Sequence, residues 1–186
     1  MFAEFALTPA QEAALVAHLD LLMRWNSKVN LTAIRSREEA IERHYCESLF
    51  LAARLPPGVL RIADVGSGAG FPGFPIAVVR PECLVTLIES HQRKGVFLRE
   101  ASRGLPNVRV LAKRAEDVEE TFDWVVSRAV SYADLASFLK ELAPNVDLLT
   151  GAEAPPENLG FDWEAVALPW GKNRFLRRGR RSSCFT

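Results

Sequence analysis

The sequence predicts an α/β protein with a doubly wound, mostly parallel sheet and an N-terminal helical appendage. From residue 60 onward, short apolar runs alternate with segments of helical periodicity, which is typical of βαβ units. Four of the eleven glycines fall within positions 66–73, directly after the first of these runs. A strand that leads straight into glycines indicates a tight turn, where a ligand can approach the backbone closely.

Length and composition indicate one compact domain of two parts, a helical appendage at 1–58 and a core at 59–186 that carries the glycine-rich turn. The 186 residues are 48% hydrophobic, and no apolar run approaches the roughly 18 residues that span a membrane. Glu4 stands where a secretory signal has a basic residue, so we expect a cytoplasmic protein. The three cysteines have no C-x-x-C spacing, so we expect neither disulfides nor a metal site.

Two helices are predicted in the appendage. Thr8, Pro9 and Gln11 form a capping arrangement that begins a helix over 9–25, and the polar stretch that follows, up to residue 34, is predicted as an ordered loop. Ser36 followed by Glu39 is a second capping box. It begins a helix over 37–55, which the sequence Pro-Pro-Gly then ends.

The core alternates strands and helices in order. Between the strands, helical segments are predicted at 90–103 and 131–143. A Pro/Gly/Glu-rich loop separates the last predicted strand from the others. The predicted strands are residues 60–65, 84–89, 108–112, 123–127, 146–150 and 161–168.

The glycine turn can be read in two registers. Asp64 precedes a G-x-G-x-G run formed by Gly66, Gly68 and Gly70, which suits S-adenosylmethionine. The same stretch contains a G-x-G-x-x-G run that ends at Gly73, which suits a dinucleotide. A Gly/Pro-rich turn without a ligand is the third interpretation.

An acidic residue strengthens the nucleotide interpretation. Glu89 ends the second predicted strand, 23 residues after Gly66, and Ser90 follows it. An acid at about this distance accepts hydrogen bonds from a ribose in such folds. We therefore expect Glu89 and Ser90 to contact the cofactor.

Charge is balanced overall, with 23 basic and 23 acidic residues, but it is unevenly placed. No Lys or Arg occurs over 141–171, whereas residues 172–181 contain six. Such a cluster is typical of a surface that binds polyanions. The alternative is a solvated tail. The residues of this cluster that we expect to bind RNA are Lys172, Arg174, Arg177 and Arg178.

Six motifs together resemble one family. They are WNSKVNLTAI, RHYCESL, DVGSGAGFPGFPIAV, IESHQRKGVFLREA, KRAEDV and VVSRAVSYADL. In this combination the chain is similar, over residues 25–139, to the bacterial ribosomal RNA small subunit methyltransferase G family, also called glucose-inhibited division protein B. The resemblance implies a class I, Rossmann-like enzyme that uses S-adenosylmethionine to methylate N7 of one guanine in 16S ribosomal RNA. After Leu142 the chain departs from the family pattern, because it reads APNVDLLTGAE instead of a Pro-Gly-Gly turn and a strand that ends in Lys-Gly.

The resemblance also implies residue roles. Ala115 and Glu116 correspond to the adenine-side motif, although a helix N-terminus with favourable acids is an equal interpretation. Asn30 and His44 correspond to positions that face the substrate, with structural roles as the alternative. The residues that would hold the methionine part of the cofactor are Gly66, Ser67, Gly68, Gly70 and Phe71.

The remaining roles concern RNA. Arg93, Lys94, Arg114 and Arg128 are expected near the carboxyl edge of the sheet, where open α/β sheets bind ligands, and there RNA would dock. We assign Arg128 to a phosphate or to the cofactor carboxylate, because an arginine bidentate to O6 and N7 would block the reacting atom. The expected partner is 16S ribosomal RNA or the small ribosomal subunit, and the expected oligomeric state is a monomer.

Two other classes of function stay open at this point. An NAD-linked oxidoreductase of the Rossmann type would use the same turn and acid, but no proton-relay pair is evident beyond the loop. A non-catalytic RNA-binding domain would bind RNA without methyl transfer.

Overall fold

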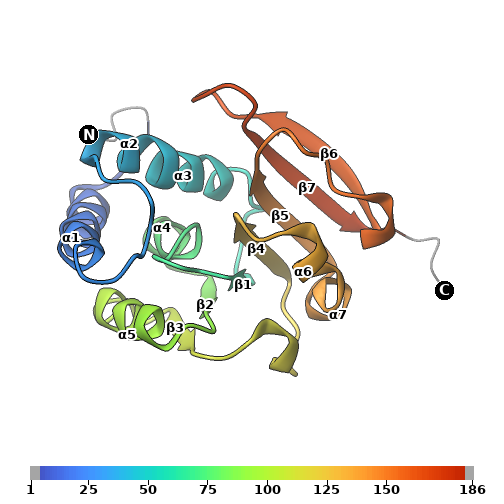
Figure 1. Cartoon of the computed structure of the whole chain (residues 1–186), viewed down its shortest axis with the longest axis horizontal. Coiled ribbons are helices and arrows are strands. Elements are labelled where there is room, and N and C mark those ends of the chain that lie inside the picture. Colours follow the sequence, from blue (N-terminus) through green and yellow to red (C-terminus); the bar gives the residue numbers. More distant parts are fainter. Residues whose placement is uncertain (1–4, 183–186) are drawn as a thin grey trace.

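The computed structural model describes residues 5–182, and Cys184 lies outside this range. A seven-stranded sheet runs through the molecule in the order β3-β2-β1-β4-β5-β7-β6 (Figure 1). The strands are β1 (Arg61–Val65), β2 (Leu84–Ile88), β3 (Val108–Leu111), β4 (Trp124–Arg128), β5 (Asn145–Thr150), β6 (Phe161–Ala167) and β7 (Phe175–Arg181).

Helices cover both faces of the sheet, as in a doubly wound fold. The α-helices are α1 (Pro9–Asn26), α2 (Arg37–Ala40), α3 (Glu47–Ala52), α4 (Gly73–Val79), α5 (Gln92–Ala101), α6 (Tyr132–Ala136) and α7 (Leu139–Leu142). A π-helix, η1 (Ile41–Cys46), joins α2 to α3, and η2 (Ala115–Asp117) and η3 (Glu157–Leu159) are single 3-10 turns.

Strands β1 to β5 are parallel to one another, which confirms the predicted parallel sheet. Neighbouring residues of β1 lie on opposite faces of the sheet: Ile62 belongs to one hydrophobic core and Ala63 to the other. Both faces therefore bury apolar side chains, which explains why the strands read as continuous apolar runs in the sequence.

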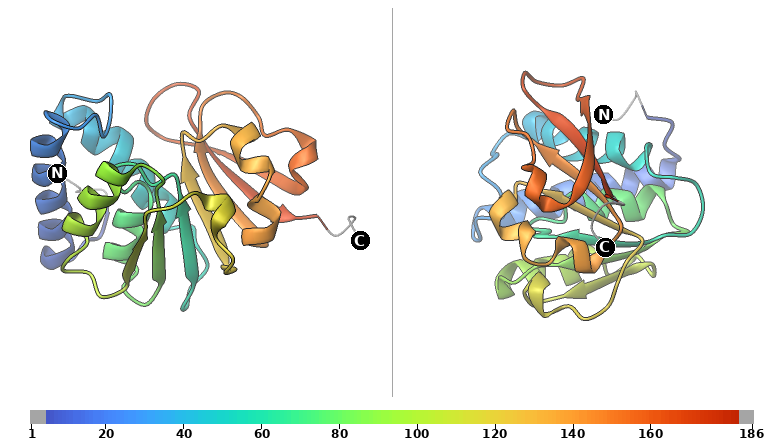
Figure 2. Two further views of the ribbon diagram at one scale, coloured as in Figure 1. Left: turned by 60° about the horizontal axis from the view of Figure 1, so that its bottom comes forward. Right: turned by 90° about the vertical axis from the view of Figure 1, so that its right-hand side faces the viewer.

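The N-terminal helices form part of the first core. Helix α4 packs on β1 and β2, α5 packs on β3, and α1 contacts both of these helices. Leu15, Leu19 and Leu22 of α1 are fully buried in the same cluster as Ile62. Helices α6 and α7 lie on the other side of the strands (Figures 1 and 2).

Helix α1 begins as predicted, because the Thr8 side chain accepts from Gln11 N while the Gln11 side chain accepts from Thr8 N. The second predicted capping box is only half formed. Ser36 Oγ accepts from Glu39 N at 3.1 Å, but the Glu39 carboxylate instead accepts from Arg43, one turn further on.

Two predicted helices are interrupted. The segment 37–55 contains the π-helix η1, and residues 44–52 are all buried, in η1 and in α3 alike. The segment 131–143 splits into α6 and α7, because Phe138 leaves the helical conformation and buries its ring in the second core. Periodicity alone indicated one continuous helix in each case.

The basic C-terminal segment is a strand of the sheet. β7 pairs antiparallel with both β5 and β6, so it lies between them. A solvated tail is therefore the wrong interpretation for Phe175–Arg181. Among the described residues, no helix is long and apolar enough to cross a membrane.

Candidate functional site

The candidate site lies where β1, β2 and β4 end. These strands are parallel neighbours, so the loops that follow Val65, Ile88 and Arg128 meet at one edge of the sheet. Gly66 N and Ser67 N both donate to Ile88 O, which fixes the start of the glycine loop against β2. The topology thus brings together two of the features that the sequence singled out, the glycines and the acid after the second strand.

The glycine loop requires glycine at defined positions. Gly66, Gly68 and Gly70 have φ angles of +69°, +56° and +92°, in the left-handed region that other residues rarely adopt. A Cβ atom on Gly66 would also lie 2.6 Å from Cγ2 of Val130. At Gly66 the backbone therefore has neither the conformation nor the room for a side chain, so a ligand can approach the loop closely there.

Asp64 lies beneath this loop. Its carboxylate is fully buried, and Oδ2 accepts from Gly73 N at 2.9 Å, at the start of α4. Burial raises the pKa of Asp64 to about 7. Asp64 lines neither cavity at this edge, and its carboxylate holds the start of α4 beneath the loop. Its place among the cofactor-binding residues stays a prediction.

Glu89 faces the loop with both carboxylate oxygens engaged. Oε2 accepts from Gly68 N at 2.9 Å and Oε1 accepts from His91 N at 2.8 Å. Each oxygen of a carboxylate has a further lone pair, so these backbone bonds leave capacity to accept hydroxyl groups. Glu89 is therefore held in place before any ligand arrives.

Two cavities open at this edge, and Gly66 and Val130 line both. The first has a volume of about 470 Å³ and the second about 260 Å³. The first is lined by the glycine loop, the loop 31–34, η1, the ends of β4 and β5, and Arg174. The second is lined chiefly by Glu89, Ser90, Lys113, Arg114, Ala115, Glu116 and Asp134.

The two cavities differ in charge. Four cationic side chains line the first cavity, and no acid of the described chain does. Three acids and two bases line the second. The first cavity therefore suits an anionic group, and the second suits a ligand rich in hydroxyl and amine donors. The four cations are Arg43, Lys94, Arg128 and Arg174.

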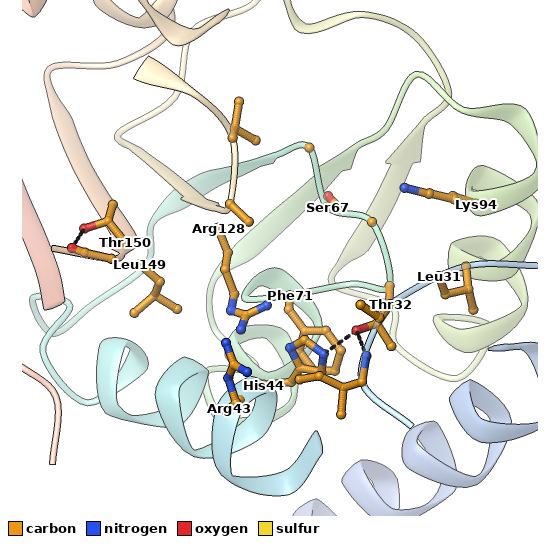
Figure 3. Close-up of a pocket in the computed structure, with 18 of the residues that line it drawn as sticks. Leu31, Thr32, Arg43, His44, Ser67, Phe71, Lys94, Arg128, Leu149 and Thr150 are labelled. Atoms are coloured by element: carbon orange, nitrogen blue, oxygen red, sulfur yellow. Dashed lines mark hydrogen bonds between the residues drawn. The ribbon is translucent and has the colours of Figure 1, made fainter. Parts of the chain in front are cut away.

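A buried acid connects the arginines of the first cavity. Glu47 of α3 is 1% exposed, and its Oε2 lies 2.5 Å from Nη2 of Arg174 and 3.5 Å from Nε of Arg128. Figure 3 shows the Arg43 and Arg128 side chains pointing toward one another beside His44. Burial lowers the pKa of Arg128, with Glu47 opposing that effect and Arg174 adding to it.

His44 forms an aromatic wall of the first cavity. Its ring stacks on Phe71 with centroids 4.6 Å apart, and its Nε2 shares a hydrogen bond of 2.9 Å with Thr32 Oγ1 (Figure 3). Burial, followed by the charge of Arg128, lowers the pKa of His44 to about 2. The ring is therefore neutral near pH 7.

The expected site residues separate into three groups. Those at the first cavity are Gly66, Ser67, Gly68, Phe71, Arg128, His44, Lys94 and Arg174. Those at the second are Gly66, Glu89, Ser90, Ala115, Glu116 and Arg114. Those that line neither are Asp64, Gly70, Asn30, Arg93, Lys172, Arg177 and Arg178.

Several residues of the third group have other partners. Asn30 is exposed, and its Oδ1 accepts from Arg35. Arg178 pairs with the fully buried Asp147 at 3.2 Å, and Arg177 donates to Ala152 O. The sequence predicted that this basic segment forms one RNA surface. In the structure its arginines have partners in different parts of the fold.

Sequence reasoning missed Arg43, Glu47 and Val130. Arg43 and Glu47 stand in the motif RHYCESL four residues apart, on one face of a helix, but nothing local in the sequence shows that this face meets the ends of β4 and β7. Val130 follows β4 directly, and only the pairing of β4 with β1 brings it over Gly66.

The sequence is similar to that of one family of known proteins. The family model for rRNA small subunit methyltransferase G matches residues 11–149. A ribosomal RNA small subunit methyltransferase G from Nitrosospira multiformis is 43% identical over 139 residues, which cover 73% of this chain and 62% of that protein. The one from Nitrosomonas europaea is 44% identical over 137 residues, 70% of this chain and 63% of that protein. The chain spans about three fifths of the length of these curated relatives.

Solved structures share the fold at low identity. A SAM-dependent methyltransferase from Aquifex aeolicus has a TM-score of 0.57 and 19% identity, covering 76% of this chain and 92% of that one. Fibrillarin from Aeropyrum pernix, whose structure holds natively bound S-adenosyl-L-methionine, has a TM-score of 0.56 and 13% identity, covering 72% of this chain and 73% of that one. At these identities the likeness concerns the fold.

Proposed function

The chain belongs to the rRNA small subunit methyltransferase G family, and from that premise we propose that it transfers a methyl group from S-adenosylmethionine to N7 of a guanine in 16S ribosomal RNA. The observation that carries the proposal is the pair of cavities that meet at Gly66. One cavity contains the ribose-binding acid expected from the sequence, and the other is open, cationic and partly aromatic.

The residues present fit this cofactor. Gly66 gives the close backbone approach that a side chain would block, and Glu89 can accept hydrogen bonds from the ribose in the second cavity. Ser90, Ala115 and Glu116 complete the adenosine side. Arg128 lines the first cavity, where it would hold the carboxylate of the methionine part.

When bound, the cofactor supplies an electrophilic methyl group on a sulfonium. The lone pair of guanine N7 can attack it directly, and N7 has no proton to lose, so the side chains have to align the base rather than act as a general base. Phe71 and His44 give the first cavity an aromatic wall for that purpose. A neutral His44 also suits the product, because methylation at N7 leaves the purine with a positive charge.

The proposal includes a cytoplasmic monomer that acts on the small ribosomal subunit or its RNA. Bacterial ribosomes are assembled in the cytoplasm, which supports that location. The described residues strongly expose three large apolar side chains, Val59, Leu84 and Val96, which is few for an obligate dimer interface.

The decisive experiment uses 16S ribosomal RNA and small subunits from a strain that lacks the gene. The purified protein with S-adenosylmethionine should add one methyl group, which mass mapping should locate on a guanine base. No methyl transfer to either substrate would contradict the proposal and favour the non-catalytic RNA-binding alternative, provided that the protein still binds RNA. Methylation of another atom would contradict the N7 assignment.

A further inference from the structure

Arg174 reaches the first cavity from a part of the chain outside the family match. The family model ends at residue 149, whereas Arg174 directly precedes β7. Its side chain is 18% exposed and is anchored on Glu47 of α3 through one terminal nitrogen. The guanidinium has five N–H donors, so this anchor leaves others for a ligand.

The first cavity has more positive charges than nearby negative charges to balance them. Glu47 contributes one carboxylate between Arg128 and Arg174. Within residues 5–182 the ion-pair partner of Arg43 is Glu39, and both side chains are more than 40% exposed, so that pairing is weak. Guanidinium groups that are brought together in this way are stabilised by an added anion.

The base is not the anion that these arginines need. The guanine is uncharged and becomes cationic when N7 is methylated, so it supplies no negative charge to balance them. A nucleotide whose base enters the cavity also brings its phosphate to the rim. Arginine is suited to phosphate because its planar donors match two oxygens at once.

On the basis of the proposed function, we propose that Arg43 and Arg174 together hold a phosphate of the RNA beside the target guanine, with Glu47 as the counter-charge that orients Arg174. Arg43 comes from η1 and Arg174 from the hairpin β6–β7. The C-terminal hairpin thus completes an RNA-positioning site that the matched region alone does not contain.

The test compares Arg174→Gln and Arg43→Gln with Arg99→Gln, which removes the same charge from an exposed arginine of α5 that lines neither cavity. The probe is 16S ribosomal RNA from the strain that lacks the gene, bound over a series of salt concentrations. Each cavity variant should weaken RNA binding about 10-fold and lower the slope of log K against log salt by roughly 0.7–0.9. Arg99→Gln should change affinity less than 2-fold, and S-adenosylhomocysteine affinity by calorimetry should stay as in the wild type for all three.

Other outcomes overturn the proposal. If Arg174→Gln weakens S-adenosylhomocysteine binding and not RNA binding, the anion is the cofactor carboxylate. If Arg174→Gln lowers the melting temperature while RNA affinity and salt slope are unchanged, Arg174 is only an ion-pair partner of Glu47. Arg174→Lys keeps one charge, so it should recover part of the RNA affinity, and failure to do so while it remains folded would contradict the charge argument.

Different measurements test the phosphate site and the proposed methyl transfer. Methyl transfer by the wild type tests the activity, whereas RNA binding by the wild type relative to Arg174→Gln tests the phosphate site. A wild type that binds RNA through Arg174 but transfers no methyl group would overturn the proposed function and leave the phosphate site supported.

Discussion

At the scale of single residues, Glu89 illustrates how one side chain can both hold a loop and bind a ligand. Its two oxygens accept from Gly68 N and His91 N, and the side chain is 7% exposed. The same carboxylate faces the second cavity. Removing its charge should therefore weaken both the anchoring of the glycine loop and the binding of a ribose.

We expect Glu89→Gln to weaken S-adenosylhomocysteine binding at least 10-fold, because charge-assisted hydrogen bonds of about 1.5–3 kcal/mol are lost. It should also lower the free energy of unfolding by about 1–3 kcal/mol, since the amide group cannot accept from both backbone N–H groups. Calorimetry and urea unfolding measure the two effects. Glu119→Gln, at an exposed acid that lines neither cavity, is the control. Equal ligand affinity in Glu89→Gln would remove Glu89 from the site.

Asp64 gives a prediction about pH. Its folded-state pKa of about 7 lies above the ordinary value of 3.8, because the carboxyl group is fully buried. Between about pH 4 and pH 7 the folded protein keeps a proton that the unfolded chain has lost. The contribution of Asp64 to stability is therefore present at low pH and is lost as pH rises toward 7.

Asp64→Asn should remove this dependence, because an asparagine oxygen can still accept from Gly73 N and the side chain stays neutral. The stability of the variant relative to the wild type should rise by a few kcal/mol from pH 4 to pH 7. Urea unfolding across this range measures the free energy of unfolding of both proteins. The other titrating groups are the same in both, so their effects cancel when the two values are subtracted. Parallel stability profiles for the two proteins would show that folding does not raise the pKa of Asp64.

At the scale of elements, Glu47 links three parts of the fold that are distant in sequence. It lies on α3, pairs with Arg128 at the end of β4 and with Arg174 before β7, and is almost fully buried. Glu47→Ala leaves both arginines without this partner. We expect a loss of about 3 kcal/mol in the free energy of unfolding. Glu42→Ala, at an exposed acid of η1, should change stability by less than about 0.5 kcal/mol.

Equal unfolding midpoints for the two alanine variants in urea would contradict the role of Glu47 as a link. The same measurement with Glu47→Ala combined with Arg174→Gln separates the pair from its surroundings. If the two residues interact, the double variant should be less destabilised than the sum of the single variants.

The C-terminal hairpin is a structural element of the sheet. Removing residues after Gly171 would delete β7 and leave β6 without its neighbour in the sheet. We expect this truncation to cost more than about 4 kcal/mol and to broaden the unfolding transition. Circular dichroism during thermal unfolding would measure it. A truncated chain with an unchanged, cooperative transition would show that β7 contributes nothing to the fold.

At the scale of the whole molecule, cofactor binding should raise stability by mass action. A ligand at 100 times its Kd adds about 2.7 kcal/mol, which for a domain of this size corresponds to a rise of roughly 5–10 °C in Tm. We expect this rise with S-adenosylhomocysteine and none with NAD, measured by calorimetric melting. A rise with NAD alone would favour the oxidoreductase alternative.

The sequence could predict the architecture because each βαβ unit is a local pattern. Helix α1 and the strands through β6 agree with the predicted segments to within one or two residues. The antiparallel place of β7 between β5 and β6 could not be predicted, because a basic segment gives no apolar alternation and pairing depends on distant strands.

The site was predictable in part for the same reason. The glycine loop and Glu89 follow strands directly, so local spacing places them at one edge. Arg174 reaches Glu47 and the first cavity only because the C-terminal hairpin packs beside α3. No local pattern in the sequence predicts that contact, because the two residues are far apart in the chain.

The position of β7 also determines the order in which the molecule is completed during its own synthesis. β6 leaves the ribosome before β7, yet its place in the sheet exists only after β7 has paired with β5. At about 5–20 residues per second, β6 waits on the order of a second with its edge uncovered. Arg174 directly precedes β7 and shares this delay, so the nascent chain has its glycine loop, Glu89 and Arg43 before it has the second arginine that we propose for the RNA phosphate.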